Sequence, residues 1–345
     1  MWTASVESPP EPLVIGAVAA GLDKADPALQ AEVARGLEAV EGRLREAVQS
    51  SNPLVTEVSR HLVDAGGKRF RPLLALLAAH LGDPTRPEVV DAAVVVELTH
   101  LASLYHDDVM DEAPVRRGAA SANARWTNTV AILTGDYLVA RASDVVAGLG
   151  PDAVRIQART FARLVEGQIS ETAGPAAGED PVAHHLQVLA DKTGSLIATS
   201  ARLGAMQAGA PDDVVERVAA FGEAFGLAFQ LSDDLIDITS ETGQSGKTPG
   251  TDLREGVRTL PVLLALADGS AQHARLRELL AGPLEDDARH TQALALLRVH
   301  PAMAGATARL QETVAQAQAT ARGLPDGPAR EALLDLAAYV VARTG

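Results

Sequence analysis

The chain has 345 residues, of which 47% are hydrophobic and only 3% aromatic, a composition that predicts an aliphatic core suited to close helix packing. It contains no cysteine, which excludes disulfide bonds and thiolate chemistry and leaves only histidines and carboxylates for any zinc site. The formal net charge of -15 argues against a nucleic-acid partner, because phosphate backbones attract basic surfaces. We find no uninterrupted apolar stretch as long as a membrane span and no basic-then-apolar leader at the N-terminus, so we expect a cytoplasmic protein.

The first residues, through about Pro12, are rich in Ser, Pro and Glu, and we expect residues 1–25 to form a flexible arm. From Asp26 onward, Ala, Leu and Val recur at helical spacing, and no convincing alternation of strand type appears. The predicted helices span residues 27–49, 53–65, 71–81, 87–112, 121–149, 151–173, 181–209, 211–239, 257–268, 271–281, 288–297, 300–322 and 327–343. The breaks between them are short, such as Gly66-Gly67 and Gly209-Ala210-Pro211. The sequence therefore predicts an all-α fold with one domain, residues 26–345.

Two aspartate clusters share the same internal spacing, Asp107-Asp108-Val109-Met110-Asp111 and Asp233-Asp234-Leu235-Ile236-Asp237. On a helix, the first and last carboxylates of each cluster project from one face, one turn apart, where like charges repel. A hard divalent cation such as Mg²⁺ is the natural counter-charge, and it leaves positions for waters and substrate phosphate. One such cluster is also compatible with a solvated acidic helix face. Each cluster here follows an apolar run, however, so the pair predicts carboxylates at the rim of a cavity that holds a diphosphate through metal.

Four basic or polar segments accompany the acids. Gly66-Gly67-Lys68-Arg69-Phe70-Arg71-Pro72 places three cations beside a flexible diglycine, where backbone amides and guanidinium forks suit a diphosphate. Arg116-Arg117-Gly118 follows the first cluster, Lys192-Thr193 lies in a predicted helix, and Gly246-Lys247 lies in the segment from Ser240 to Thr251, which suits a lid. Each segment alone is compatible with a plain turn or a solvated surface, so the interpretation depends on the complete set.

In this order the motifs closely resemble those of the trans-isoprenyl diphosphate synthases, also called the polyprenyl synthetase family. The resemblance runs from roughly Leu54 to Leu266 and also includes Gly135-Asp136, Gly167-Gln168 and Thr259-Leu260-Pro261. It implies an all-helical bundle around a deep central cavity, of the isoprenoid synthase type and usually homodimeric. It also implies a Mg²⁺-dependent enzyme that condenses isopentenyl diphosphate head-to-tail with an allylic diphosphate. Such a hydrophobic product suggests transient proximity to a membrane at release.

Matching positions in the family's motifs imply roles for individual residues. Asp107, Asp111 and Asp233 would bind Mg²⁺, about three ions in all, with Asp108 and Asp237 supporting them. Contact with the allylic diphosphate is implied for Arg116, Lys192 and Lys247. Contact with isopentenyl diphosphate is implied for Lys68, Arg71, His100 and Arg117, although His100 without the family position would be interpreted as a satisfied core histidine. Thr193 and Gln230 would stabilise the cationic carbon with their oxygen dipoles.

The implied mechanism follows from electrostatics. Metal ions and cations neutralise the leaving diphosphate, so the allylic carbon–oxygen bond ionises to a delocalised carbocation. An aliphatic cavity excludes the water that would quench this cation. The double bond of isopentenyl diphosphate then attacks it, and a proton is lost, by resemblance to the released diphosphate.

Product length should depend on the residues beneath the first aspartate cluster. Ala102 precedes Asp107 by five residues, which places it roughly 7 to 8 Å deeper along the helix. Short-chain members of the family have an aromatic floor at this level, whereas Ala102, Ser103 and Thr99 are small here, and Tyr105 should point away from the cavity. We therefore expect a long-chain product of roughly six to ten five-carbon units (C30 to C50), of the kind used as a quinone side chain. A geranylgeranyl-type product is the nearest alternative.

The sequence departs from the family pattern at one position and leaves two further alternatives open. Val257 stands where many relatives have a lysine before Thr-Leu-Pro, and on a helix Arg258 would point elsewhere. A class I terpene cyclase would share the ionisation chemistry but would not need Lys68, Arg71 and Arg117. A non-catalytic subunit of a heteromeric synthase would have eroded clusters, whereas both clusters here are complete, although an intact subunit can still depend on a partner.

Overall fold

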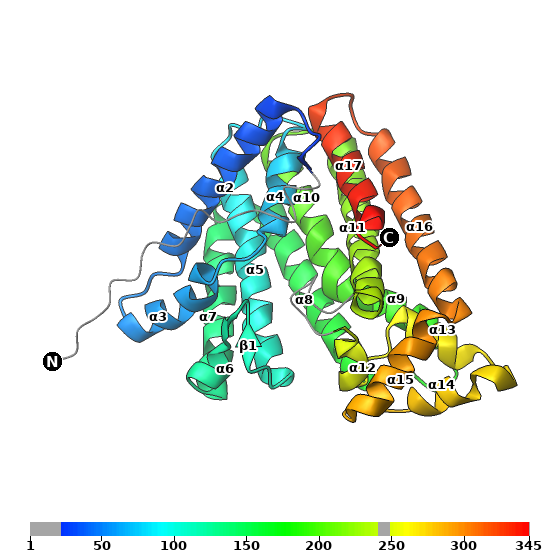
Figure 1. Ribbon diagram of the computed structural model, residues 1–345. Coiled ribbons are helices and arrows are strands. Elements are labelled where there is room, and N and C mark those ends of the chain that lie inside the picture. The colour runs from blue at the N-terminus through cyan, green and yellow to red at the C-terminus, as the bar shows by residue number, and fades with distance from the viewer. Residues whose placement is uncertain (1–21, 241–248, 345) are drawn as a thin grey trace.

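The computed structural model describes residues 22–240 and 249–344, and this part of the chain is almost entirely helical (Figure 1). The first half contains α2 (Pro27–Ala47), α3 (Pro53–Asp64), α4 (Phe70–Ala79), α5 (Glu88–Met110), β1 (Val115–Arg116), β2 (Ala119–Ala120), α6 (Ala122–Arg125), α7 (Asn128–Ala147) and α8 (Pro151–Ala173). The second half contains α9 (Pro181–Leu189), the π-helix η1 (Ala190–Gly194), α10 (Ser195–Gln207), α11 (Asp212–Thr239), α12 (Thr251–Glu255), α13 (Leu260–Ala267), the 3₁₀ turn η2 (Ala271–His273), α14 (Ala274–Leu279), α15 (Asp287–Arg298), α16 (Pro301–Arg322) and α17 (Pro328–Ala342). The all-α prediction is confirmed.

Several helices begin at an Asx-Pro pair. Asp26, Asn52 and Asp180 each accept a hydrogen bond from a backbone N–H of the first turn, and a proline follows each of them. The side chain satisfies a backbone donor that has no partner within the helix, while proline fixes the first helical φ and has no N–H to satisfy. These helix starts are therefore encoded locally, which explains why the predicted boundaries fall within a residue or two of the observed ones.

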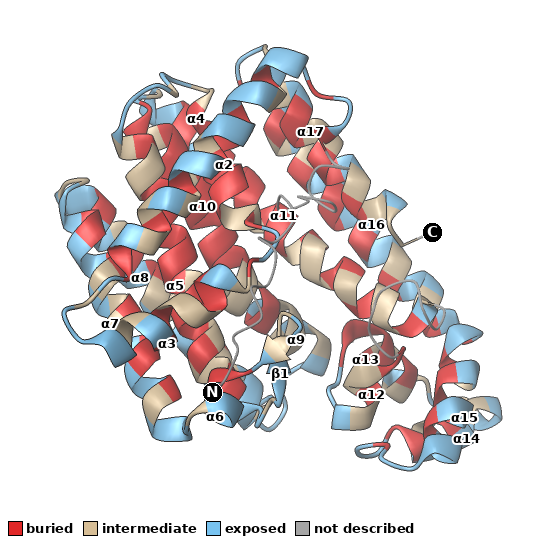
Figure 2. Cartoon of the chain, turned by 60° about the vertical axis from the view of Figure 1, so that its left-hand side comes forward, coloured by how far each residue is buried: buried red, intermediate tan, exposed pale blue. Residues whose placement is uncertain are grey.

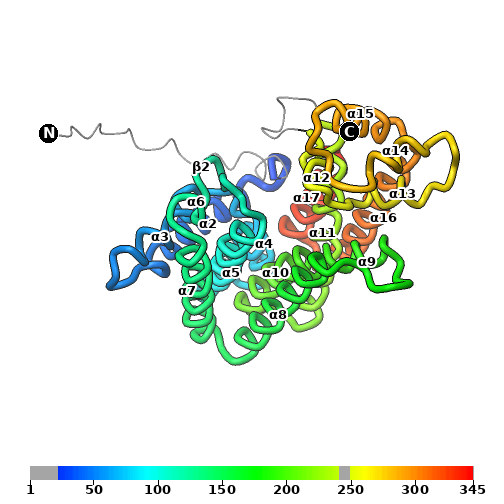
Figure 3. Tube along the Cα trace, turned by 90° about the horizontal axis from the view of Figure 1, so that it is seen from below, coloured from blue at the N-terminus to red at the C-terminus, as the bar shows by residue number. Residues whose placement is uncertain are grey.

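The core is built around α4, α5 and α10, each of which carries a long run of buried residues (Figure 2). Helix α5 packs against α4, α7 and α10, and α10 in turn packs against α4 and α11. Viewed from below, α5 and α10 lie between the group formed by α2, α3, α6 and α7 and the group formed by α11, α16 and α17 (Figure 3). Helix α5 is long and apolar enough on average to span a membrane, although Glu97 and His100 interrupt its apolar stretch, and 72% of that stretch is buried inside the bundle, as in a core helix of a globular fold.

A second, smaller hydrophobic core forms beyond the end of α11. It gathers apolar side chains of α12, α13, α14 and α15 around Ile238 and Ala302, separately from the main core. In Figure 1 these short helices lie together at one end of the molecule. They cover the side of the bundle on which the second aspartate cluster lies.

Between residues 115 and 209, the structure corrects the sequence prediction at three places. Residues 115–120 form a two-stranded hairpin that pairs Val115 with Ala120 and Arg116 with Ala119, where we expected no strand. The segment predicted as one helix from 121 to 149 is interrupted at Trp126, whose φ of -118° and ψ of -98° end α6 before Thr127 caps α7. The segment predicted as one α-helix from 181 to 209 contains the π-helix η1.

The last four residues of the segment expected to form the N-terminal arm, residues 22–25, lie within the described part of the chain. Leu22 and Ala25 are buried in the main core, and the Gln30 side chain donates hydrogen bonds to both of their carbonyl oxygens. Residues 22–25 therefore pack against the bundle. The rest of the expected arm, residues 1–21, lies outside the described part of the chain.

Candidate active site

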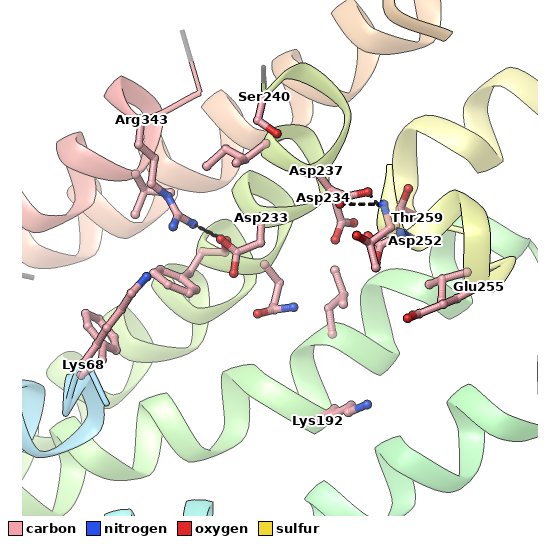
Figure 4. Close-up of a pocket in the computed structure, with 18 of the residues that line it drawn as sticks. Lys68, Lys192, Asp233, Asp234, Asp237, Ser240, Asp252, Glu255, Thr259 and Arg343 are labelled. Carbon is pink, nitrogen blue, oxygen red and sulfur yellow. Dashed lines mark hydrogen bonds and ion pairs between the residues drawn. The ribbon is translucent and has the colours of Figure 1, made fainter. Parts of the chain in front are cut away.

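A cavity of about 1120 Å³ lies between the C-terminal end of α5 and the C-terminal half of α11. Its polar wall includes members of both aspartate clusters together with several cations, and its apolar wall includes aromatic and aliphatic side chains of α4, α11 and α17. Figure 4 shows Asp233, Asp234 and Asp237 on one side of this pocket, with Lys68 and Lys192 approaching from other elements. Of the residues predicted from the sequence, the cavity wall contains Lys68, Asp111, Arg116, Lys192, Gln230 and Asp233.

The first aspartate cluster lies at the end of α5. Asp107 is half-buried, and burial raises the pKa of its carboxyl, an effect that nearby Asp111 reinforces and Lys192 opposes. Asp111 caps the helix and lines the cavity. Asp108 is fully buried and accepts a hydrogen bond from Arg116 Nε at 2.5 Å, so it holds Arg116 in place at the cavity wall.

The second cluster lies in the last turns of α11, and each carboxylate contacts a different element. Asp233 Oδ1 lies 2.9 Å from Arg343 Nη2 just beyond α17 (Figure 4). Asp234 Oδ2 lies 3.2 Å from His185 Nε2 on α9. Asp237 accepts hydrogen bonds from the backbone N–H groups of Thr251 at 3.1 Å and Asp252 at 3.3 Å. Asp237 thereby fixes the start of α12 against the cavity rim.

The π-helix η1 carries Lys192 and Thr193. Arg163 on α8 anchors this irregular turn by donating from Nε to Asp191 at 2.5 Å and from Nη1 to Glu223 at 3.1 Å. Lys192 Nζ contacts Glu171 at 2.5 Å and lines the cavity, whereas Thr193 is half-buried and does not contribute to the cavity wall. Short π-helical turns inside α-helices frequently occur at functional sites.

A cluster of arginines lies beside the cavity, between α4 and the hairpin. Burial lowers the pKa of Arg71 to about 10 and the charge of Arg117 adds to this shift, while Glu97 opposes it. Arg71 Nε is buried and has no hydrogen-bond partner among the described residues. His100, on the same side of α5, has a pKa well below its usual value because of burial and the charges of Arg71 and Arg117. A buried guanidinium with an unmet donor is a group that an anion would satisfy.

The diglycine and the hairpin turn form one unit that places Arg117. The turn residues Arg117 and Gly118 both have positive φ, of 54° and 77°, as a tight two-residue hairpin requires. Arg117 Nη1 donates to Leu62 O at 3.0 Å and also to Gly66 O. A Cβ on Gly67 would lie 2.7 Å from Arg117 Cζ, so only glycine leaves room for the guanidinium.

Some predicted residues lie elsewhere. Thr99, Ala102 and Ser103 are buried in the core and do not line the cavity, so in this structure they do not form its floor. The Tyr105 hydroxyl donates to Val58 O in α3, which directs the ring away from the cavity as predicted. Lys247 lies outside the described residues.

At the departure from the family pattern, Val257 lines the cavity and Arg258 is exposed, consistent with a missing cation there. Residues 256–258 lie between α12 and α13 and are not helical. Arg258 therefore does not lie on the helix that we expected to span 257–268, and it is absent from the cavity wall.

Sequence reasoning missed Arg343, His185 and Glu97. Arg343 is held by Ser232 Oγ and by the carbonyl of Phe229, both at 2.8 Å, but it lies 110 positions after Asp233 in the sequence. His185 and Glu97 lie on predicted helices, where a single histidine or glutamate gives no indication in the sequence that it belongs to a functional site. Only the packing of α9, α17 and the Gly66–Arg71 segment brings these side chains to the site.

A separate His/Asp cluster lies away from the cavity. Asp268, His273 and His300 are the one group of three such side chains within the described ranges that are placed closely enough to share a metal ion. His300 Nδ1, however, accepts a hydrogen bond from the N–H of Ala302 at 3.0 Å, so the neutral ring carries its proton on Nε2, facing Asp268. A metal-binding histidine normally donates, rather than accepts, through its other nitrogen. We therefore interpret this cluster as a structural contact at the junction between α13 and α16, and not as a metal site.

The donor set around the main cavity fits Mg²⁺. Its possible ligands are carboxylate oxygens from two helices, and Asp108 Oδ2 is buried without a hydrogen-bond partner within residues 22–240 and 249–344. No cysteine is available, and oxygen ligands without nitrogen or sulfur select hard cations. Asp107, Asp111 and Asp233 are the carboxylates that could hold such ions beside bound phosphate.

Residues 52–297 match the family model for polyprenyl synthetase. Nonaprenyl diphosphate synthase from Mycobacterium tuberculosis is 51% identical over 95% of this chain and 98% of that protein, and heptaprenyl diphosphate synthase component 2 from Geobacillus stearothermophilus is 39% identical over 88% and 94%. A crystal structure of geranylgeranyl pyrophosphate synthase from Corynebacterium glutamicum, complexed with calcium and isoprenyl diphosphate, superposes with a TM-score of 0.85, at 47% identity over 93% of this chain and 98% of that one.

An all-helical bundle with paired aspartate clusters around one cavity, together with these relatives, defines the protein as a prenyltransferase. The chain belongs to the polyprenyl synthetase family.

Proposed function

We propose that the protein is an all-trans polyprenyl diphosphate synthase that condenses isopentenyl diphosphate with an allylic diphosphate in the presence of Mg²⁺. One observation carries the proposal: carboxylates of both clusters face Lys68, Arg116 and Lys192 across a single cavity of about 1120 Å³. Beside this cavity, the unmet donor of Arg71 supplies a second site for an anion. Two anion sites are what a reaction between two diphosphates requires.

The two sites have different surroundings, which supports a division of roles. We assign the allylic diphosphate to Arg116, Lys192 and Lys247, on the side of the aspartates. We assign isopentenyl diphosphate to Lys68, Arg71, His100 and Arg117, where guanidinium groups outnumber carboxylates. Bound Mg²⁺ would supply charge neutralisation at the leaving diphosphate.

The remaining chemistry belongs to the chain itself. Lys192 and Arg116 orient the allylic diphosphate, and the apolar wall that includes Phe225, Phe229 and Leu336 excludes water from the reacting carbon. Gln230 lines the cavity, where the dipole of its side-chain oxygen would stabilise positive charge. Thr193 would need to turn toward the cavity to do the same.

We propose a long-chain product. Its support is the 51% identity to a protein named nonaprenyl diphosphate synthase. In addition, the small side chains of Thr99, Ala102 and Ser103 place no aromatic barrier at this level of α5, although they lie in the core and outside the cavity wall. The alternative of a C20 product rests on the similarity to the geranylgeranyl pyrophosphate synthase of known structure.

A homodimer in the cytoplasm completes the proposal. Its support is the row of exposed apolar side chains on the neighbouring helices α7 and α8, including Leu133 and Ile169, which are 62% and 61% exposed. Analytical ultracentrifugation of the purified protein tests the dimer directly, and a monomer at micromolar concentration would exclude it.

A partner-dependent synthase is the second candidate. One relative is named component 2 of a heptaprenyl diphosphate synthase, which marks that protein as one part of a larger assembly. The complete aspartate clusters of this chain favour activity without a partner.

The decisive experiment incubates purified protein with Mg²⁺ and radiolabelled isopentenyl diphosphate, supplying geranyl, farnesyl or geranylgeranyl diphosphate in separate reactions. We expect dephosphorylated products of roughly 30 to 50 carbons, because position 102 on α5 carries a small side chain and not an aromatic one. Products ending at 20 carbons would support the geranylgeranyl alternative. An absence of incorporation would favour a partner-dependent subunit or a terpene cyclase.

A further inference from the structure

The side chain of Glu97 is an unusual charge for the centre of α5. It is only 1% exposed, and it lies one turn before His100 and ten residues before Asp107. An ionised carboxylate at such a depth is retained only where partners compensate its lost hydration. Its partners come from two segments that are far apart in the sequence.

Glu97 Oε1 joins those two segments. It accepts a hydrogen bond from Arg69 Nη1 at 3.0 Å and lies 3.6 Å from Arg117 Nη2. Arg69 begins α4 with a positive φ of 45°, and Arg117 occupies the hairpin turn with a φ of 54°. Both backbones adopt a conformation that is uncommon for residues with a Cβ, so something beyond local preference holds them.

The arginines around Glu97 differ in how fully contacts within the protein compensate their charges. Burial alone would lower the pKa of Arg69, but its ion pairs with Glu41 and Glu97 raise it overall. The pKa of Arg117 is lowered, chiefly by burial, although Glu97 opposes the shift. Arg71 faces Glu97, and its Nε has no hydrogen-bond partner in the part of the chain that the structure describes. Arg69 is therefore committed to protein contacts, whereas Arg71 and Arg117 retain donor capacity.

We propose that Glu97 is a positioning residue for the isopentenyl diphosphate site. It fixes Arg117 and the start of α4 so that Arg71 and Arg117 converge on one diphosphate. Glu97 does not itself bind this substrate, because a carboxylate repels it. The inference rests on the proposed function, since it assigns the arginine cluster to isopentenyl diphosphate.

The direction in which the KM for isopentenyl diphosphate changes when the charge of Glu97 is removed distinguishes a positioning role from a role as a simple counter-charge. The substitution Glu97→Gln keeps the shape of the side chain and removes its charge. If Glu97 were only a counter-charge, its removal would leave the arginines more attractive to an anion, and the KM for isopentenyl diphosphate would fall. If Glu97 positions the arginines, that KM rises by about tenfold or more, while the KM for the allylic diphosphate changes by less than about twofold.

Glu41 provides a matched control. It also pairs with Arg69, through both carboxylate oxygens, but no contact joins it to Arg117. Glu41→Gln therefore removes the same charge from the same arginine. We expect both variants to lower the melting temperature, and only Glu97→Gln to raise the KM for isopentenyl diphosphate. An equal KM in the two variants would overturn the proposal.

The variant Glu97→Asp covers the case in which Glu97→Gln does not fold. This variant keeps the charge but shortens the reach of the side chain by one methylene. If both variants fold, we expect the KM of Glu97→Asp for isopentenyl diphosphate to lie between those of the wild type and Glu97→Gln. If only Glu97→Asp folds, we expect its KM to be clearly higher than that of the wild type. An unchanged KM in Glu97→Asp together with a wild-type KM in any folded Glu97→Gln protein would contradict the positioning role.

Calorimetric titration of the metal-loaded protein with isopentenyl diphosphate alone separates this inference from the proposed function. If the wild type does not bind isopentenyl diphosphate, the proposed function fails and the inference fails with it. If the wild type and Glu97→Gln bind it equally well, only the role of Glu97 is excluded. Binding weakened about tenfold or more in Glu97→Gln, and retained in Glu41→Gln, supports the inference.

Discussion

Arg343, just beyond the last helix, is paired with Asp233, the first carboxylate of the second aspartate cluster, at 2.9 Å. The guanidinium also lies 4.1 Å from the ring centroid of Phe229, which keeps it over α11. The end of the chain thus places a cation on a carboxylate that we assign to metal. Arg343 and a divalent ion would compete for the same oxygen.

Replacing Arg343 with Gln should therefore lower the Mg²⁺ concentration that gives half-maximal activity by about two- to fivefold, because a partly exposed ion pair contributes little energy. A titration of initial rate against Mg²⁺ measures this. Arg330→Gln is the control, since Arg330 lies in the first turn of α17, the helix that Arg343 follows, and pairs with Glu331 at 2.8 Å, away from the main cavity. A higher Mg²⁺ requirement in Arg343→Gln would instead show that Arg343 binds substrate phosphate.

Replacing Asp107 or Asp233 with Ala should reduce turnover by about a thousandfold or more, because charge stabilisation at the leaving group would be lost. The readout is incorporation of labelled isopentenyl diphosphate at saturating Mg²⁺. Asp144→Asn controls for the loss of a carboxylate, since Asp144 is exposed on α7 and pairs with Arg141. Retained activity in both site variants would refute the metal assignment.

Ala102→Phe should shorten the product if the chain grows past this position on α5. Ala102 is fully buried, so the larger side chain should also destabilise the fold by about 1 to 3 kcal/mol through overpacking. Product length by chromatography is compared with that of Ala317→Phe, an equally buried alanine on α16 that reports overpacking alone. A folded Ala102→Phe enzyme with an unchanged product would place the floor of the cavity elsewhere.

His100 should couple binding of isopentenyl diphosphate to proton uptake. Burial and the neighbouring arginines hold its pKa well below its usual value, so the free enzyme carries it neutral near pH 7. A bound diphosphate adds negative charge and raises that pKa, so binding takes up a proton and strengthens as the pH falls between the two values. Calorimetry at about pH 6.5 in buffers of different ionisation enthalpy measures the uptake. His100→Gln should abolish the part of the measured heat that depends on the ionisation enthalpy of the buffer. Identical proton uptake in the wild type and His100→Gln would exclude His100 as the group that takes up the proton.

The same depressed pKa predicts how stability varies with pH. The unfolded chain binds a proton at His100 more readily than the folded chain does, so the free energy of unfolding should decrease as the pH falls below about 6.5. Denaturant melts of the wild type and His100→Gln at pH 7.5 and pH 5.5 test this, and the loss of stability should be smaller in the variant. An equal loss in both proteins would assign the pH dependence to other groups.

Most of the fold followed from local signals. Asx-Pro pairs start α2, α3 and α9, and helical spacing of Ala, Leu and Val marks the long helices, because both depend on residues within one or two turns. The hairpin at 115–120 was missed because its strands are only two residues long. The break at Trp126 and the π-helix at 190–194 were missed because packing, and not propensity, decides them.

The sequence by itself determined the chemistry of the site: two matched aspartate clusters and a fixed order of cations, readable because helical spacing converts sequence distance into a shared face. Only the tertiary structure decided which groups meet. It brought Arg343 to Asp233 and His185 to Asp234, it joined Arg69 and Arg117 through Glu97, and it buried Ala102 in the core. These contacts join elements tens to more than a hundred residues apart, and their distances are set by how the helices pack, which no local pattern records.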